Sequence, residues 1–319
     1  MRIDDIISGA KTVAISGHIR PDGDCIGSNM ALYLYIKKNY PCIRVDCFLE
    51  KIPECYKIIE ATAEVNSEFK TNVDSYDVFF AIDCGKERLG QAEAIFDAAK
   101  KRINIDHHVS NTGTGDDNYI VPTASSAAEL VYNCLDKDKL DADIAKAIYM
   151  GIVTDTGVFK YNNTSPDTMR VAADLISYGF DFGSLIDHVF YEKTYVQNQI
   201  LGRALLESMR IMHGDCVVSV VSRQTMEFYQ VESSDLDGIV SQLLLTTGTE
   251  CAIFMYEIGS LEYKVSLRSK GKVNVAKIAE LFGGGGHPRA AGCTMNGTQH
   301  DIINSLSEYI ERSLKGVVS

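Results

Sequence analysis

Two adjacent histidines end an apolar run in residues 103–111, INIDHHVSN. The chain has only seven histidines, so the placement of His107 beside His108, directly after Asp106, is unusual. Imidazole is a frequent metal ligand and acid–base group, and a neighbouring carboxylate can orient it or bind the metal itself. Polar residues at the end of a buried strand would give the same pattern, so partners elsewhere in the chain must decide between the two interpretations.

A second group of candidate ligands lies in residues 17–28, GHIRPDGDCIGS. The spacing H-x-x-x-D-x-D places His18, Asp22 and Asp24 on a loop between a strand expected at 12–16 and a helix expected from residue 28 onward. One imidazole and two carboxylates on a bent backbone suit divalent cations such as Mn²⁺. A capped turn is the alternative, because Asp and Gly are common turn residues.

Two further acids stand at the ends of expected elements. Asp83 ends an apolar run that begins near residue 76, and Asp155 follows a helix expected at 141–153, in the block GIVTDTG. Asp83 could instead cap the following helix, and Asp155 could be an exposed loop acid. However, the C-terminus of a helix repels a carboxylate, and a bound cation would compensate Asp155 there.

The first half of the chain alternates strands with helices. Apolar runs predict four strands, at residues 12–16, 43–49, 76–82 and 102–105. Helical segments are expected between them, including residues 50–71. This alternation favours an α/β fold with a doubly wound, mainly parallel sheet and right-handed crossovers. Ligands collect outside the carboxyl ends of such strands, so the acids and histidines are expected to share one site there.

The second half predicts a smaller α/β domain with a mixed sheet. We expect a catalytic domain at 1–190, a helical linker at 191–211 and the second domain at 212–319. Two strands are expected at 251–258 and 261–267, joined by a short Gly-Ser turn. The second of these strands leads directly into Arg268 and Lys270.

A glycine-rich block, GGGGHPRAAG, follows a helix expected at 275–282. Four consecutive glycines leave backbone N–H groups free to approach a phosphate or a base closely. The block fits neither G-x-G-x-x-G nor the Walker A pattern, which makes a dinucleotide cofactor or an ATPase a weak interpretation. A flexible helix end is the plain alternative, since Gly after a helix is ordinary.

Composition limits the classes of protein. The formal net charge is −12, which argues against binding to long nucleic acid by a clustered basic surface. The nine cysteines form no C-x-x-C pair and are odd in number, so reduced thiols are expected rather than a disulfide framework. The sequence shows neither a secretory signal nor an apolar run long enough to cross a bilayer, so we expect a cytoplasmic protein without membrane contact.

Together, these motifs resemble one known family. The blocks GHIRPDGDCIGS, AIDCG, IDHHVSN and GIVTDTG resemble the motifs of the DHH phosphoesterase superfamily. The stretch GGGHPRAAG is similar to the GGGH-x-x-A-A-G signature of the C-terminal domain that accompanies many DHH proteins. The resemblance covers nearly the whole chain, and no block lacks its key residue.

The resemblance implies a two-metal site, with two Mn²⁺ ions or, alternatively, Mg²⁺ or another divalent cation. The implied ligands are His18, Asp22, Asp24, Asp83, His107 and Asp155. The first two would bind one ion, Asp83 would bridge both ions, and the remaining three would complete the second site. A hydroxide between two cations would then attack phosphorus in line with the leaving oxygen.

The resemblance also implies roles for residues that bind no metal. Asp106 would be a supporting acid, and His108 would face the scissile phosphate as a catalytic group. In the second domain the substrate would contact Arg268, His287, Gly285 and Gly286. The active site is accordingly expected in the cleft between the two domains.

Among DHH proteins, the arrangement is similar to the nanoRNase/pAp phosphatase branch, whose members act on very short RNAs or on 3′-phosphoadenosine 5′-phosphate (pAp). The expected partners are therefore short oligoribonucleotides or small nucleotides, and not long duplexes. A cyclic dinucleotide phosphodiesterase is the nearest alternative; an inorganic pyrophosphatase and a non-catalytic nucleotide-binding regulator are less favoured. The sequence decides neither base preference nor oligomeric state, and a homodimer is compatible with it.

Overall fold

A computed structural model describes residues 1–316 of the chain, which forms two compact units, with the boundary between Glu192 and Lys193. The first unit contains a sheet of five strands: β1 (Thr12–Ser16), β2 (Arg44–Phe48), β3 (Val78–Ile82), β4 (Arg102–Asp106) and β5 (Asp117–Ile120). Its helices are α1 (Ile3–Ile6), α2 (Gly23–Asn39), α3 (Glu93–Ala98), α4 (Ala127–Cys134), α5 (Ala142–Asp155), α6 (Pro166–Ile176) and α7 (Phe182–Ile186).

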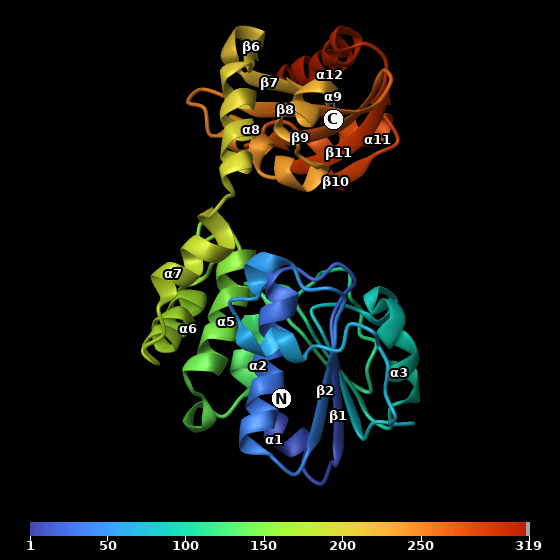
Figure 1. Ribbon diagram of the computed structural model, residues 1–319, viewed down its shortest axis with the longest axis vertical. Helices are drawn as coiled ribbons and strands as arrows, with labels where there is room; N and C mark the ends of the chain where they lie inside the picture. Colours follow the sequence, from blue (N-terminus) through green and yellow to red (C-terminus); the bar gives the residue numbers. More distant parts are fainter. Residues whose placement is uncertain (317–319) are drawn as a thin grey trace. The chain divides into compact units, whose positions relative to one another are not determined.

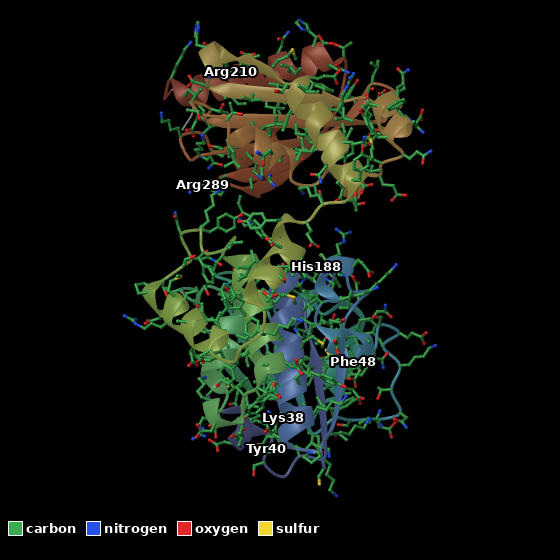
Figure 2. The ribbon with its side chains drawn as sticks, turned by 60° about the vertical axis from the view of Figure 1, so that its left-hand side comes forward. Lys38, Tyr40, Phe48, His188, Arg210 and Arg289 are labelled. Atoms are coloured by element: carbon green, nitrogen blue, oxygen red, sulfur yellow. The ribbon has the colours of Figure 1, made fainter. Side chains whose placement is uncertain are left out.

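The first sheet is parallel throughout, in the order β2-β1-β3-β4-β5. Helices α2 and α5 lie side by side on one face and α3 lies on the other (Figure 1). Alternate residues of β3 therefore enter different cores: Phe80 packs with α2 and α5, whereas Phe79 packs with Phe96 and Phe48. Of these side chains, that of Phe48 is labelled in Figure 2. Burial on both faces explains why this strand is apolar without alternation.

Three local features differ from the sequence expectation. Helix α2 begins at Gly23 and not at residue 28, because Asp22 caps it and accepts hydrogen bonds from the backbone N–H groups of Asp24 and Cys25. Residues 50–71 form no α-helix but two short 3₁₀ turns, η1 (Glu54–Tyr56) and η2 (Glu60–Glu64). Strand β5 was not expected, because its sequence DNYI is short and polar at a sheet edge.

The second unit has a mixed sheet in the order β10-β11-β9-β8-β7-β6, in which the β7–β8 pair is parallel and the other pairs are antiparallel. Its strands are β6 (Met209–Ile211), β7 (Cys216–Val221), β8 (Cys251–Gly259), β9 (Glu262–Ser269), β10 (Gly285–His287) and β11 (Ala290–Asn296). The helices are α8 (Tyr195–Leu206), α9 (Arg223–Tyr229), α10 (Ile239–Leu244), α11 (Val275–Leu281) and α12 (Gln299–Leu314). The expected α/β fold, with one parallel and one mixed sheet, is confirmed.

Two helix layers cover the faces of the second sheet. Helices α11 and α12 bury Ile278 and Leu306 in one core, and α8 and α10 bury Ile200 and Leu243 in the other. Of the segment expected as a linker, residues 195–206 form α8, which packs into this second core. The division between the two units lies before this helix.

The glycine-rich block ends a helix and then forms a strand. Gly283, with φ +72°, and Gly284 donate hydrogen bonds to carbonyl oxygens in the last turn of α11. Gly285 to His287 form β10, which pairs antiparallel with β11 at the edge of the sheet. Gly286 has φ +148°, and a Cβ there would lie 2.4 Å from the carbonyl oxygen of Ala290. A side chain at this position would therefore separate the two strands.

All nine cysteines are free thiols. No helix within residues 1–316 is both long enough and apolar enough to span a bilayer.

Candidate metal centre

The six predicted metal ligands lie beyond the carboxyl ends of β1, β3 and β4 or at neighbouring helix ends. His18 follows β1, Asp83 follows β3 and His107 follows β4. Asp24 lies in the first turn of α2, and Asp155 is the last residue of α5. Parallel pairing of the three strands brings their carboxyl ends to one edge of the sheet, as expected for a ligand site in an open α/β sheet.

Asp83 lies between two imidazoles. Its Oδ2 atom is 3.4 Å from Nε2 of His18, and its Oδ1 atom is 3.4 Å from Nε2 of His107. The side chain is nearly fully buried, and its Oδ1 atom has no hydrogen-bond partner. Asp83 also has φ +64°, a left-handed conformation that costs a non-glycine residue about 1–2 kcal/mol. A buried, unbonded carboxylate oxygen on a strained residue indicates a functional constraint.

His107 joins Asp83 to two more carboxylates. Its Nε2 atom lies 3.6 Å from Oδ2 of Asp24 and 3.9 Å from Oδ2 of Asp155. Burial alone would lower the pKa of His107, but the neighbouring Asp83 and Asp155 outweigh it and raise the pKa to about 9. Burial raises the pKa of Asp155 to about 6, although His107 acts in the opposite direction. Such mutual perturbation is typical of a site arranged to hold cations.

Asp24 is fixed by the start of α4. Its two carboxylate oxygens accept hydrogen bonds from the backbone N–H groups of Ala127, at 2.6 Å, and Ala128, at 2.9 Å. Burial, together with the charges of Asp83 and Asp155, nevertheless raises the pKa of Asp24. The positive end of the α4 dipole offsets only part of this cost, so the group still lacks a full counter-charge.

The second side of the centre contains His18, Asp22 and Cys25. Nδ1 of His18 lies 2.8 Å from the carbonyl oxygen of Ile19, so Nε2 is the nitrogen that faces Asp83 and, at 3.7 Å, Oδ1 of Asp22. The Cys25 thiol is also close enough to Asp83 and His18 to share a cation with them. However, burial raises the pKa of Cys25 to about 12, which keeps the thiol protonated at neutral pH.

Asp106 and His108 form a hydrogen-bonded pair beside the centre. Oδ1 of Asp106 lies 2.7 Å from Nδ1 of His108 and accepts hydrogen bonds from the backbone N–H groups of His107 and His108. This bond to Asp106 raises the pKa of His108, whose side chain is 39% exposed. His108 is thus an oriented, accessible imidazole with a stabilised charged form.

The four residues expected to contact the substrate lie in the second unit. Arg268 on β9 pairs in register with Ala290 on β11, and Ala290 pairs with His287 on β10. Residues paired in this way point to the same face of a sheet, so Arg268 and His287 flank a small alanine. Gly285 and Gly286 precede His287 on the exposed edge strand.

Two family matches divide the chain in agreement with these two units. Residues 12–152 match the DHH family N-terminal domain, and residues 214–316 match the DHHA1 domain. The chain therefore contains a DHH domain followed by a DHHA1 domain. This confirms the resemblance drawn from the sequence motifs.

Two relatives and one solved structure add detail. The chain is 28% identical over 298 residues to the Bacillus subtilis "Bifunctional oligoribonuclease and PAP phosphatase NrnA", covering 91% of each protein. It is 26% identical to the Listeria monocytogenes "Cyclic-di-AMP phosphodiesterase PdeA", covering 96% of this chain but 49% of that protein. The crystal structure of an exopolyphosphatase-related protein from Bacteroides fragilis has the same fold, with a TM-score of 0.87, 22% identity and coverage of 99% and 96% of the two chains.

Sequence reasoning missed residues that hold the DHH loop in place. Asn104 donates hydrogen bonds from Nδ2 to the carbonyl oxygens of Ala81 and Cys84, on either side of Asp83. Its Oδ1 atom accepts a hydrogen bond from Asn111, which also donates to Asp106. The adjacency of Asn104 to the DHH block was visible in the sequence, but nothing in the strand pattern distinguished it from a core residue.

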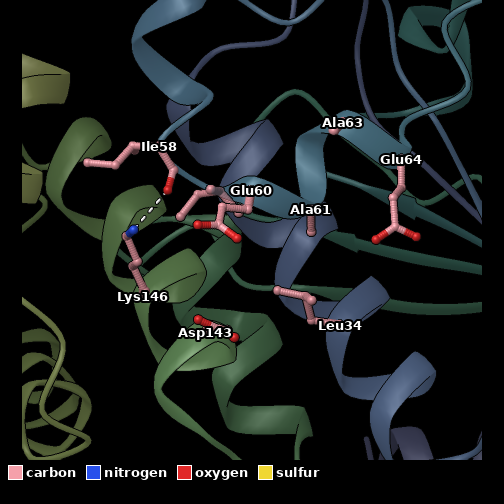
Figure 3. Close-up of a pocket in the computed structure, with 9 residues that line it drawn as sticks. Leu34, Ile58, Glu60, Ala61, Ala63, Glu64, Asp143 and Lys146 are labelled. Carbon is pink, nitrogen blue, oxygen red and sulfur yellow. Dashed lines mark hydrogen bonds between the residues drawn. The ribbon is translucent and has the colours of Figure 1, made fainter.

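The cavity in Figure 3 lies apart from the DHH centre. It has a volume of about 390 Å³ and is bordered by α2, η2 and α5, with Glu60, Glu64, Asp143 and Lys146 among its lining residues. Nζ of Lys146 donates a hydrogen bond to the carbonyl oxygen of Ile58. None of the six predicted metal ligands lines this cavity.

Proposed function

We propose that this chain is a phosphoesterase that uses divalent cations, Mn²⁺ foremost, to hydrolyse short oligoribonucleotides and pAp. The observation that carries the proposal is the position of Asp83, whose two carboxylate oxygens face His18 and His107 separately. One buried carboxylate between two imidazoles is the arrangement that a pair of cations with a shared ligand requires. The name of the Bacillus subtilis relative, at 28% identity, supports this substrate class.

The residues present fit two divalent cations. Asp24, Asp83 and Asp155 converge around His107, and an uncompensated cluster of three carboxylates is unfavourable. Oxygen and imidazole ligands together suit Mn²⁺, whereas a thiolate site would favour a softer metal. We therefore assign His18 and Asp22 to one ion, Asp24, His107 and Asp155 to the other, and Asp83 to both.

Cations bound there would supply Lewis-acid activation of water and would neutralise charge on the phosphoryl oxygens. The chain itself supplies a proton donor: Nδ1 of His108 is held by Asp106, so Nε2 is available to a substrate. The hydrogen bond to Asp106 favours the protonated imidazole, which can stabilise a phosphoryl oxygen or protonate the leaving group. Asp106 positions this group and the two backbone N–H groups next to it.

We further propose that the second unit contacts the substrate through Arg268, His287, Gly285 and Gly286. Arg268 and His287 share one face of the sheet, separated by the small side chain of Ala290. A guanidinium and an imidazole on either side of a small residue suit a nucleotide, because they offer phosphate contacts with space for a ring between them.

A cyclic dinucleotide phosphodiesterase is the second candidate, favoured by the match to the Listeria monocytogenes protein. One experiment separates the candidates. The purified chain is incubated with Mn²⁺ and, in parallel, with pAp, RNAs of two to five nucleotides, cyclic di-AMP and pyrophosphate, and the products are resolved chromatographically. Hydrolysis of the short RNAs and pAp is expected. Turnover of pyrophosphate alone, or of no substrate, would contradict the proposal.

A further inference from the structure

A surface cavity of about 580 Å³ lies at the same edge of the first sheet as the metal centre. Most of its walls come from the segments that follow β1 and β2, which are parallel neighbours in the sheet, and Gln91 comes from the segment after β3. The lining residues are Arg20, Pro21, Glu50, Lys51, Pro53, Ser67, Phe69 and Gln91. Arg20 is two residues beyond His18, so the cavity begins where the proposed metal site ends.

The backbone at Arg20, at the edge of the cavity, has an unfavourable conformation and is fixed by hydrogen bonds. Arg20 has φ +54°, a left-handed conformation that is unfavourable for a residue with a Cβ. Its backbone N–H donates a 2.8 Å hydrogen bond to Oε2 of Glu50, and the N–H of Ile19 donates to the carbonyl oxygen of Arg88. These bonds tie the loop that carries His18 to the segment after β2, through Glu50, and to the segment after β3, through Arg88. They fix the direction in which Arg20 leaves the backbone.

The charges in the cavity differ from those of the chain as a whole. Arg20 and Lys51 are both exposed, and neither forms an ion pair within residues 1–316. Glu50 is the one carboxylate in the lining, and its Oε2 atom is occupied by the N–H of Arg20. The cavity thus carries two positive side chains, although the protein as a whole has a net charge of −12.

The rest of the lining offers apolar surface. Pro21, Pro53 and Phe69 form part of the walls. The ring of Phe69 stacks on that of Phe48, with 6.3 Å between centroids. This packing fixes the orientation of the Phe69 ring. Cations beside rigid apolar surface are the combination that binds single-stranded nucleic acid, through its phosphates and through its sugars or bases.

We propose that this cavity is a subsite for the phosphodiester backbone of the nucleotides beyond the scissile phosphate, with Arg20 and Lys51 as its phosphate contacts. This inference rests on the proposed function and deepens it, because it assigns the longer part of an oligoribonucleotide to the loops after β1 and β2. A substrate such as pAp has no second nucleotide and does not reach the subsite. The cavity thus favours RNAs of several nucleotides over mononucleotides.

The test compares Lys51→Ala with Lys11→Ala, which removes the same charge from the amino end of β1. Turnover of a five-nucleotide RNA and of pAp is measured with Mn²⁺ over a range of salt concentrations. For Lys51→Ala the ratio of KM for RNA to KM for pAp is expected to rise about three- to tenfold, and the salt dependence of KM for RNA to weaken. Lys11→Ala should leave the ratio unchanged. Arg20→Asn, which tolerates the left-handed backbone, should act like Lys51→Ala.

Binding to a fluorescently labelled five-nucleotide RNA, measured in the presence of a chelator, separates this inference from the proposed function. Weaker RNA binding by Lys51→Ala, together with wild-type protein that hydrolyses neither substrate, would uphold the subsite and overturn the proposed function. If the wild type hydrolyses RNA but Lys51→Ala changes neither RNA binding nor the KM ratio, the subsite is wrong. An equal loss on RNA and on pAp would likewise overturn it, because that result indicates a general role.

Discussion

Gly27 and Gly151 bring helices α2 and α5 into direct backbone contact. A Cβ on Gly27 would lie 2.7 Å from the backbone nitrogen of Gly151, and a Cβ on Gly151 would lie 2.9 Å from Oδ1 of Asp24. The two glycines therefore allow α5, which ends in Asp155, to approach the turn of α2 that carries Asp24. Because neither glycine has a side chain, Asp24 and Asp155, two proposed ligands of one metal, can lie close together.

Replacement of Gly27 by alanine is expected to destabilise the chain by about 1–3 kcal/mol, because the added methyl group overpacks a helix contact formed by backbone atoms. The free energy of unfolding in urea measures this change. Gly202→Ala is the matched control: that glycine lies in α8, where an added Cβ would meet no atom within 4 Å, and alanine there should stabilise by up to about 1 kcal/mol. Equal effects at both positions would refute the role of the α2–α5 contact.

Asp83→Asn should abolish turnover and weaken binding of Mn²⁺ while the fold persists. Asparagine keeps the shape of the side chain and tolerates the left-handed backbone at φ +64°, so the loss of charge is the main change. Asp83→Ala should have the same effect on metal and activity. Metal binding is measured by calorimetry and folding by urea denaturation. Asp74→Asn, at an exposed acid before β3, is the control. Full activity of either Asp83 variant would contradict the bridging assignment.

The convergence of the proposed ligands could be predicted from the sequence, because several of them follow strands with strong apolar runs. Burial of β3 on both faces made the run before Asp83 easy to recognise, and parallel pairing then placed its end beside His18 and His107. The other candidate acids were identified from the spacing of residues within the motifs.

The rest depends on contacts that a single sequence does not display. The two bonds of Asn104 to carbonyl oxygens around Asp83 join segments about twenty residues apart, and no periodicity signals them. The strand within the glycine-rich block was not expected, since the pairing of β10 with β11 arises from close backbone approach and not from side-chain pattern. Strand β5 is short and polar, and its neighbour β4 determines its place.

Substitutions of the two adjacent histidines should have different effects on Mn²⁺ binding and on turnover. His107→Ala removes a group that contacts three carboxylates and should weaken Mn²⁺ binding. His108→Ala should leave Mn²⁺ affinity close to that of the wild type but lower turnover by about 10²–10⁴-fold, the range typical of a lost general acid. Calorimetry and steady-state kinetics on a short RNA measure the two effects. Loss of metal binding in His108→Ala would reassign it as a ligand.

Asp77 should make stability depend on pH. It accepts hydrogen bonds from Nζ of Lys100 and from the backbone N–H groups of Lys11 and Thr12, and these hold its pKa below the ordinary value. A carboxyl with a lowered pKa in the folded state contributes stability above its unfolded pKa of about 4, and this contribution is lost as the pH falls through the folded pKa. Asp77→Asn should therefore lower the free energy of unfolding at pH 7, and the difference from wild type should shrink below about pH 4. A difference that does not vary with pH would show that the charge is unimportant.

Asn104→Ala should couple stability to metal binding. The substitution removes two buried hydrogen bonds, from Nδ2 to the carbonyl oxygens of Ala81 and Cys84, and each lost bond costs about 0.5–1.5 kcal/mol. Because these carbonyls flank Asp83, the strained backbone there also loses its support, and Mn²⁺ affinity should fall together with the free energy of unfolding.

Asn118→Ala is the control for this prediction, because the side chain of Asn118 bonds to the backbone of Gly115, in the exposed turn before β5. It should lose less than about 1 kcal/mol and keep the wild-type affinity for Mn²⁺. If Asn104→Ala is destabilised but binds Mn²⁺ as the wild type does, Asn104 stabilises the sheet and has no effect on the metal site. A fall in affinity restricted to Asn104→Ala, measured where both variants are fully folded, would instead show that the geometry of Asp83 depends on one amide group in the neighbouring strand.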